Sequence, residues 1–174
     1  MALEQYSPSF ASRSGKVLLI LLPFFTGVIC VLLSFVPVGM IIGVNIVPIF
    51  GLMVVYHWAV TRPEMLPPFT VFAIGLLFDL LSAGPMGLWA LAFVVGYGVI
   101  RGQRSLLFGR PFAVFWAGFG ASALLTGVVA WVIASLYYGA FLSPAELIIQ
   151  LVVTVLFFPP FAALFSRVQG RLSS

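Results

Sequence analysis

The chain has few residues that could take part in chemistry, and Asp79 is the most informative of them. It is the only carboxylate inside a long apolar region, in the stretch GLLFDLLSAGPMGLWAL from Gly75 to Leu91. Burying an ionisable group in such a region is costly, so we expect a partner, water or a proton to compensate it. Three roles stay open: a hydrogen bond that fixes helix packing or the adjacent turn, a contact with a partner or ligand, or no specific role.

Other kinds of reactive site are poorly represented. The sequence has one cysteine, Cys30, and one histidine, His57, which are too few for a cysteine or histidine metal site. The nucleotide-binding loops, the zinc-protease motif and the paired carboxylates of a hydrolase are absent from the sequence. A proton-coupled transporter usually has several ionisable residues in its membrane helices. We therefore predict a protein that is not an enzyme, with no cofactor and no metal.

The composition indicates what surrounds Asp79. Of the 174 residues, 63% are hydrophobic and only 7% are charged, whereas a typical soluble domain has roughly 25% charged residues. Such a chain cannot cover its surface with polar groups, so we expect an integral membrane protein. The apolar runs are continuous and do not alternate with polar residues, which favours helices over a β-barrel. The predicted fold class is all-α.

The apolar runs predict a bundle of six membrane-spanning helices. Proline, glycine or basic residues separate the runs, and these residues break helices or stay outside the bilayer. We expect tails at 1–16 and 167–174 around a membrane domain at 17–166. The predicted spans are 17–36, 41–60, 67–82, 86–100, 112–136 and 146–165.

The number of spans depends on whether SAGP, from Ser82 to Pro85, is a turn. One helix over 69–100 would be about 48 Å long, too long for an ordinary span, and would leave five spans. It would also divide the eight Lys and Arg residues between the two sides of the membrane. With a turn at SAGP, all eight fall on the same side. The positive-inside rule therefore favours six spans with both termini cytoplasmic.

Aromatic residues are expected to mark the two membrane–water interfaces, as aromatic belts do. The residues predicted near the inner interface are Tyr56, Trp58, Tyr97 and Trp116. Those predicted near the outer interface are Trp89, Trp131, Tyr137 and Tyr138.

Asp79 shares one helix face with Gly75, four residues before it, and with Ser82, three residues after it. That face is small and polar, so we expect it to point into the bundle. In the six-span arrangement, Asn45, Gln150 and Ser34 would lie at a similar depth in the outer third of the membrane. We predict a polar cluster of Asp79 with Asn45, and with Gln150 and Ser34 as further members. The alternative is that each residue lines its own turn.

Two further groups complete the candidate residues. Small and turn-forming residues near Asp79 are predicted to shape the turn and its packing: Gly75, Gly84, Pro85 and Gly87. A basic loop is predicted to set the topology and to touch anionic lipid headgroups, with a cytoplasmic partner as the alternative. This loop carries Arg101, Arg104 and Arg110.

The stretch around Asp79 resembles the signature region of the MreD family, the rod shape-determining membrane proteins of bacteria. In that family a glycine is followed four residues later by an aspartate, then by a small-residue turn, a Met-Gly or Leu-Gly pair and an Ala-Leu pair. The upstream stretch VPIFGLMVVYHWAVTRPEMLPP is also similar to the second span of the family. The matching residues are Gly75, Asp79, Ser82 to Gly84, Met86-Gly87 and Ala90-Leu91, with Pro48, Tyr56 and Pro63 upstream.

The resemblance implies a non-enzymatic subunit of the cell-elongation complex in the bacterial inner membrane. It implies binding to the bitopic protein MreC, and through MreC to the MreB filament. RodA and its penicillin-binding transpeptidase would act beside it in peptidoglycan synthesis, and no nucleic acid would be involved. The family also implies a helical fold shared with the S-components of vitamin transporters. The rival hypothesis is therefore a subunit that binds a small molecule or lipid near the outer face, although the short outer connections leave little loop to cap a ligand.

Overall fold

The structure, a computed structural model, describes residues 10–35 and 48–172. Within these residues it contains seven α-helices, one short 3-10 helix and no β-strand. The predicted all-α fold class is therefore confirmed for the described part of the chain. The elements are α1 (Phe10–Ser34), α3 (Phe50–Thr61), η1 (Pro63–Met65), α4 (Pro68–Ser82), α5 (Leu88–Gly102), α6 (Arg104–Leu107), α7 (Phe112–Tyr138) and α8 (Ala145–Leu172).

Two of these helices are long and apolar enough to cross a membrane: α7, and the part of α8 that spans Ala145–Arg167. Shorter apolar helices accompany them, at Leu21–Ser34, Phe50–Thr61, Pro68–Ser82 and Leu88–Gly102. Each of the predicted spans except the second coincides with one described helix to within a few residues at most ends. For the second, predicted at 41–60, α3 begins only at Phe50, and residues 41–47 lie outside the described residues.

The helix ends near the turns follow local backbone rules. Helix α4 begins at Pro68, whose fixed φ and missing N–H suit the first helical position. Just beyond its last turn, Ala83 takes the left-handed conformation with φ 51°. Gly139 ends α7 in the same way with φ 61°, a conformation that glycine adopts without strain. The chain reverses direction at both points.

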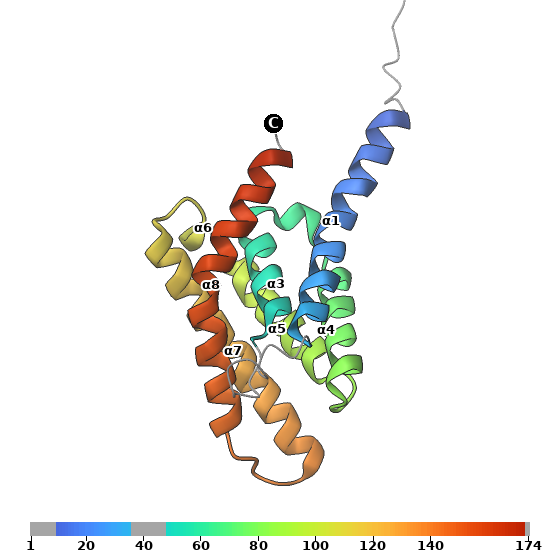
Figure 1. Cartoon of the computed structure of the whole chain (residues 1–174). Helices are drawn as coiled ribbons and strands as arrows, with labels where there is room; N and C mark the ends of the chain where they lie inside the picture. Colours follow the sequence, from blue (N-terminus) through green and yellow to red (C-terminus); the bar gives the residue numbers. More distant parts are fainter. Residues whose placement is uncertain (1–9, 36–47, 173–174) are drawn as a thin grey trace, which may run out of the picture.

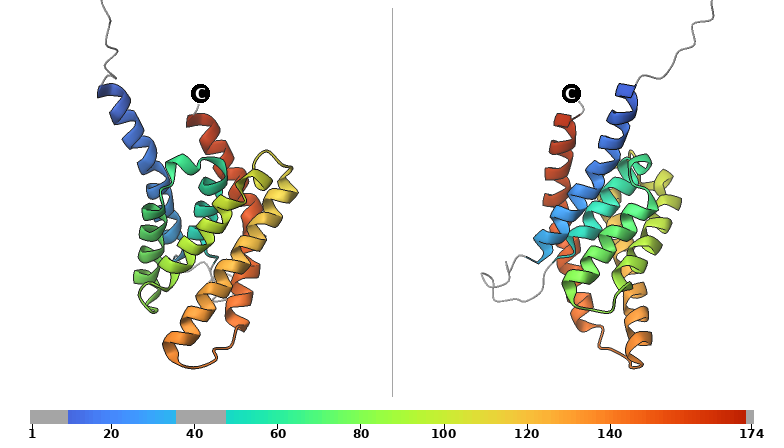
Figure 2. Two further views of the ribbon diagram at one scale, coloured as in Figure 1. Left: turned by 180° about the vertical axis from the view of Figure 1, so that it is seen from behind. Right: turned by 90° about the vertical axis from the view of Figure 1, so that its right-hand side faces the viewer.

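Helix α3 forms the centre of the molecule. All its residues from Gly51 to Val60 are buried, and it contacts α1, α4, α5, α7 and α8. Figures 1 and 2 show it enclosed by the longer helices. A helix that is apolar on every side can be buried on every side, so the composition of α3 is compatible with its central place.

Tyr56, Trp58 and Tyr97 do not face lipid as the residues of an aromatic belt do, because all three side chains are buried. That they lie near the level of the inner interface stays a prediction. The Tyr56 hydroxyl donates to the carbonyl of Phe115 (2.8 Å), and the Tyr97 hydroxyl donates to the carbonyl of Leu66 (2.6 Å). A buried ring whose polar tip has a partner inside the protein contributes to the core and not to an aromatic belt.

The outward faces of the bundle carry large apolar side chains. Ile29 on α1, Leu80 on α4, Leu124 on α7 and Leu156 on α8 are 62%, 62%, 60% and 62% exposed. Proteins in water rarely expose extended apolar surface of this kind. The surface suits lipid as its surroundings.

The two ends of the bundle differ in charge. The start of α1, the end of α8, η1 and α6 lie at the upper end in Figure 1, while the α4–α5 turn and the α7–α8 loop lie at the lower end. We call the upper end the basic end and the lower end the turn end. The segments at the basic end contain all eight basic residues: Arg13, Lys16, Arg62, Arg101, Arg104, Arg110, Arg167 and Arg171.

Candidate functional site at the turn between α4 and α5

Asp79 lies in the last turn of α4, and its side chain is 1% exposed. Its carboxylate accepts three backbone N–H groups: from Gly87 (3.0 Å), Trp89 (2.8 Å) and Ala90 (3.1 Å). The first two bonds go to different oxygens, and the third shares an oxygen with the first. Both oxygens of the buried carboxylate therefore have donors.

These donors belong to the N-terminus of α5. The first N–H groups of a helix have no partner within the helix, and they form the positive end of its dipole. The residue before α5 is Gly87, which has no side chain to accept them. Asp79, on the neighbouring helix α4, accepts these N–H groups instead. The unfavourable position of a carboxylate near the end of α4 is thus compensated by the start of α5.

Gly75 allows the two helices to approach closely enough for this contact. A Cβ atom on Gly75 would lie 2.6 Å from Cα of Ala90 and 2.8 Å from the carbonyl oxygen of Trp89. Both are backbone atoms, which cannot move aside as a flexible side chain could. Gly75 and Asp79 therefore contact the same two residues of α5, which is a physical reason for a glycine and an aspartate four residues apart.

The turn itself depends on two left-handed residues, Ala83 with φ 51° and Gly87 with φ 94°. Only Gly87 adopts its conformation without a side chain to strain it. The Pro85 carbonyl accepts the N–H of Leu88 (3.3 Å), which leads the chain into α5. Gly84 has φ outside the left-handed region, and a Cβ there would meet only Ser82 Oγ at 3.6 Å. Neither its backbone nor the space around it requires a glycine.

The hydrogen bonds of the Ser34 hydroxyl go to residues other than Asp79. The Ser34 hydroxyl donates to the carbonyl of Cys30 (3.1 Å) and accepts the N–H of Phe50 (3.1 Å), so it caps the start of α3. The pairing of Asp79 with Asn45 stays a prediction, because Asn45 lies outside the described residues. Gln150 is described, on α8, and its place in that cluster stays a prediction.

Thr154 on α8 was missed by the sequence reasoning. Its hydroxyl accepts the N–H of Ile49 (3.0 Å) and donates to the carbonyl of Gln150 (2.7 Å). Together with Ser34, it meets the first N–H groups of α3 from a neighbouring helix, as Asp79 does for α5. A threonine in the middle of an apolar helix, one turn after a glutamine, was the available signal.

A family model described as rod shape-determining protein MreD matches residues 12–168, which include every residue of the α4–α5 turn. The chain belongs to the MreD family. No curated protein and no solved structure matches the chain. MreD proteins are shape-determining membrane proteins and not a known enzyme family.

In this MreD-family chain, two of the three arginines of the basic loop are held by the protein itself. Arg101 Nη1 donates to the Tyr97 hydroxyl (3.2 Å), and Arg104 Nε donates to the carbonyl of Val60 (2.9 Å). The Arg104 guanidinium also lies over the ring of Phe108, 4.9 Å from its centre. Arg110 is exposed. The loop is therefore tied to the core and leaves Arg110 for contacts outside the chain.

Proposed function

We propose that this protein is a non-enzymatic, multi-pass subunit of the bacterial cell-elongation complex in the inner membrane. It binds MreC, and through MreC it supports MreB, RodA and its penicillin-binding transpeptidase in peptidoglycan synthesis and shape maintenance. The observation that carries this proposal is the match of the MreD family model to residues 12–168. The absence of a nucleotide loop from the sequence agrees with a subunit that acts by binding.

We infer a topology of six spans with both termini cytoplasmic, with short tails at 1–16 and 167–174. The support is the basic end, where all eight Lys and Arg residues belong to segments on one side of the bundle. Basic residues in short loops are retained on the cytoplasmic side. Helices α4 and α5 have 15 residues each, about 22 Å, so they cross only with local thinning or with their ends near the interfaces.

In this topology, Asp79 maintains the shape of the turn end, which faces the periplasm. The buried carboxylate fixes the start of α5 against α4 through three backbone bonds. A rigid turn lowers the entropy that a partner must remove on binding. Asp79 is thus a positioning residue: it supports the surface that MreC recognises without needing to touch MreC.

The alternative hypothesis, a transporter subunit that binds a small molecule, has less support. Under that hypothesis Asp79 would contact a ligand near the outer face. However, its carboxylate is 1% exposed and both oxygens already accept backbone N–H groups. A ligand would have to displace those bonds, leaving buried donors unpaired at considerable cost.

Co-purification tests the proposal. The tagged protein should retain MreC through extraction of rod-shaped cells, and its depletion should round the cells. Asp79→Asn, which keeps the size and one acceptor oxygen, should retain less MreC at equal membrane abundance. Glu146→Gln removes an exposed acid at the same end and should leave MreC recovery unchanged. A stable protein that recovers no MreC, and instead retains a small molecule together with an ATPase, would contradict the proposal in favour of the transporter reading.

A further inference from the structure

One hydroxyl group of the bundle is bonded differently from the others. Hydroxyls within the helices typically donate to a carbonyl one turn earlier, as Thr26 does to Leu22 (2.9 Å) and Thr126 to Ser122 (2.8 Å). The Ser135 hydroxyl, in the last turn of α7, is buried but meets no hydrogen-bond partner among residues 10–35 and 48–172. A buried hydroxyl without a partner is costly, so Ser135 is poised to bond with something outside the chain.

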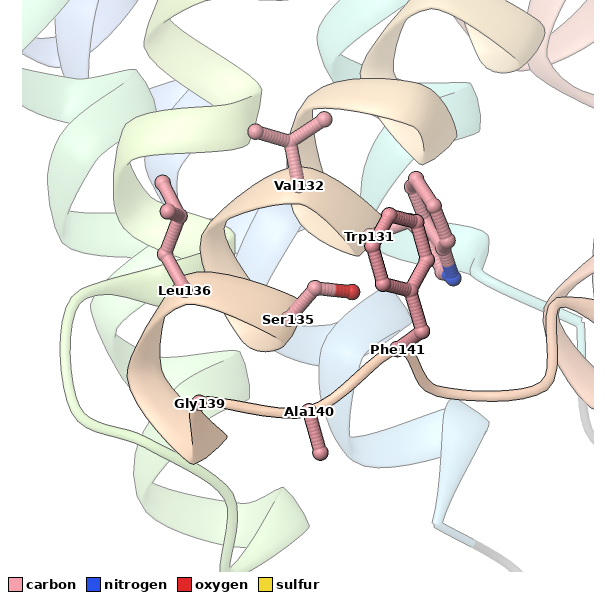
Figure 3. A pocket seen from close by; sticks show the side chains of 7 residues that line it. All are labelled: Trp131, Val132, Ser135, Leu136, Gly139, Ala140 and Phe141. Carbon is pink, nitrogen blue, oxygen red and sulfur yellow. The ribbon is translucent and has the colours of Figure 1, made fainter.

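Ser135 lies in a cavity of about 410 Å³ at the turn end of the molecule. Figure 3 shows its hydroxyl pointing toward the rings of Trp131 and Phe141. The Trp131 N–H is already used, because it donates to the carbonyl of Leu142 (3.0 Å). The remaining lining is apolar or backbone: Val132, Leu136, Gly139 and Ala140. The cavity thus offers one hydrogen-bond donor among apolar walls.

The position and charge of this cavity narrow the ligand class. It lies beside Tyr137 and Tyr138, which are 68% and 56% exposed at the end of α7. Exposed tyrosines at the end of an apolar helix mark the level at which headgroups meet acyl chains. All eight basic residues lie in segments at the opposite end, so no cation of this chain attracts a phosphate here. The bound group is therefore neutral, largely apolar, and able to accept one hydrogen bond.

We propose that the cavity binds the ester-bearing part of a diacyl membrane phospholipid. The Ser135 hydroxyl donates to an ester carbonyl, and the adjoining acyl chain lies against Trp131, Val132 and Leu136. Phe141, at 92% exposed, covers the site from the loop side. The inference goes beyond the elongation complex: it requires the membrane but not MreC.

A photoreactive phospholipid tests this site. The full-length protein in detergent is irradiated with a phosphatidylethanolamine that carries a diazirine near the top of one acyl chain, and adducts are mapped by mass spectrometry. Unlabelled diester phosphatidylethanolamine competes in one series, and its diether analogue, which lacks both carbonyls, competes in the other. We expect an adduct within residues 131–141, with the diester competing about threefold to tenfold better than the diether, as one net hydrogen bond implies.

Matched variants separate the hydrogen bond from apolar contact. In Ser135→Ala the diester and the diether should compete equally well for the adduct within residues 131–141. Ser143→Ala removes an exposed hydroxyl outside the cavity, so the diester should still compete better than the diether in that variant. Phe141→Ala should weaken both competitors equally. The proposal is overturned if no adduct forms in this segment, if the competitors are equal in the unmodified protein, or if Ser135→Ala keeps the difference. Equal competition would assign the hydroxyl to water.

Discussion

At the scale of single residues, the sequence predicted that Asp79 needs a compensating partner but did not predict which groups supply it. Its apolar surroundings indicated that the carboxylate needs compensation, and the predicted partners were the side chains of other spans. The described bonds go instead to the backbone N–H groups of Gly87, Trp89 and Ala90. Almost every residue has a backbone donor, so such a partner leaves no mark in a sequence pattern. Only the folded turn brings the start of α5 to Asp79.

The three hydrogen bonds from the start of α5 to Asp79 should contribute to the free energy of unfolding, which substitutions at Asp79 can measure. Asp79→Ala should lower the free energy of unfolding by about 2–3 kcal/mol, because it leaves buried N–H groups without acceptors. Asp79→Asn should cost about 1 kcal/mol, because it keeps one acceptor but loses the charge that the α5 dipole favours. Denaturant unfolding of the purified protein in detergent would give both values.

Glu146→Gln is the control for these variants, because Glu146 is exposed in the first turn of α8. This substitution should lower the free energy of unfolding by no more than about 0.5 kcal/mol. If Asp79→Ala unfolds at the same denaturant concentration as the unmodified protein, the three backbone bonds do not stabilise the turn.

At the scale of helices, the sequence predicted where the helices begin and end better than it predicted how they pack. Helix α7 begins at the predicted residue and ends two residues beyond the predicted 136, and α5 begins two residues after the predicted 86. Long apolar runs bounded by glycine, proline or arginine explain this agreement. The burial of the aromatic residues of α3 was not predicted, because a sequence does not show which apolar helix the others surround. The close contact between Gly75 and Ala90 could not be predicted from the sequence either.

Close packing of α4 on α5 predicts opposite effects for two glycine substitutions. Gly75→Ala should destabilise the protein by about 1–3 kcal/mol, because its Cβ would collide with the backbone of Ala90 and separate the helices. Gly98→Ala on α5 should be neutral or stabilising by up to about 1 kcal/mol, since no atom lies within 4 Å of the added Cβ and alanine favours helix. Thermal unfolding of the two variants side by side tests this. Equal stability of both would argue against a close contact at Gly75.

At the scale of the whole molecule, the charge distribution is the strongest link between sequence and structure. A turn at SAGP was inferred because only that turn gathers the basic residues on one side. In the structure α4 ends at Ser82 and α5 begins at Leu88, and the segments with Lys and Arg meet at one end. The central place of α3 and the capping of its N-terminus by Ser34 and Thr154 could not be predicted, because they depend on how the helices pack against one another.

The proposed role of Asp79 in supporting the surface that MreC recognises depends on the turn end facing the periplasm, and cysteine accessibility tests this most directly. In a Cys30→Ala background, single cysteines at Ala83 in the α4–α5 turn and at Ser105 in α6 are treated with a membrane-impermeant maleimide in spheroplasts and again after lysis. Both positions lie outside the apolar helices and are exposed. We predict that Ala83→Cys reacts in intact spheroplasts and that Ser105→Cys reacts only after lysis. Labelling of Ser105→Cys from outside, with Ala83→Cys protected, would contradict the six-span topology.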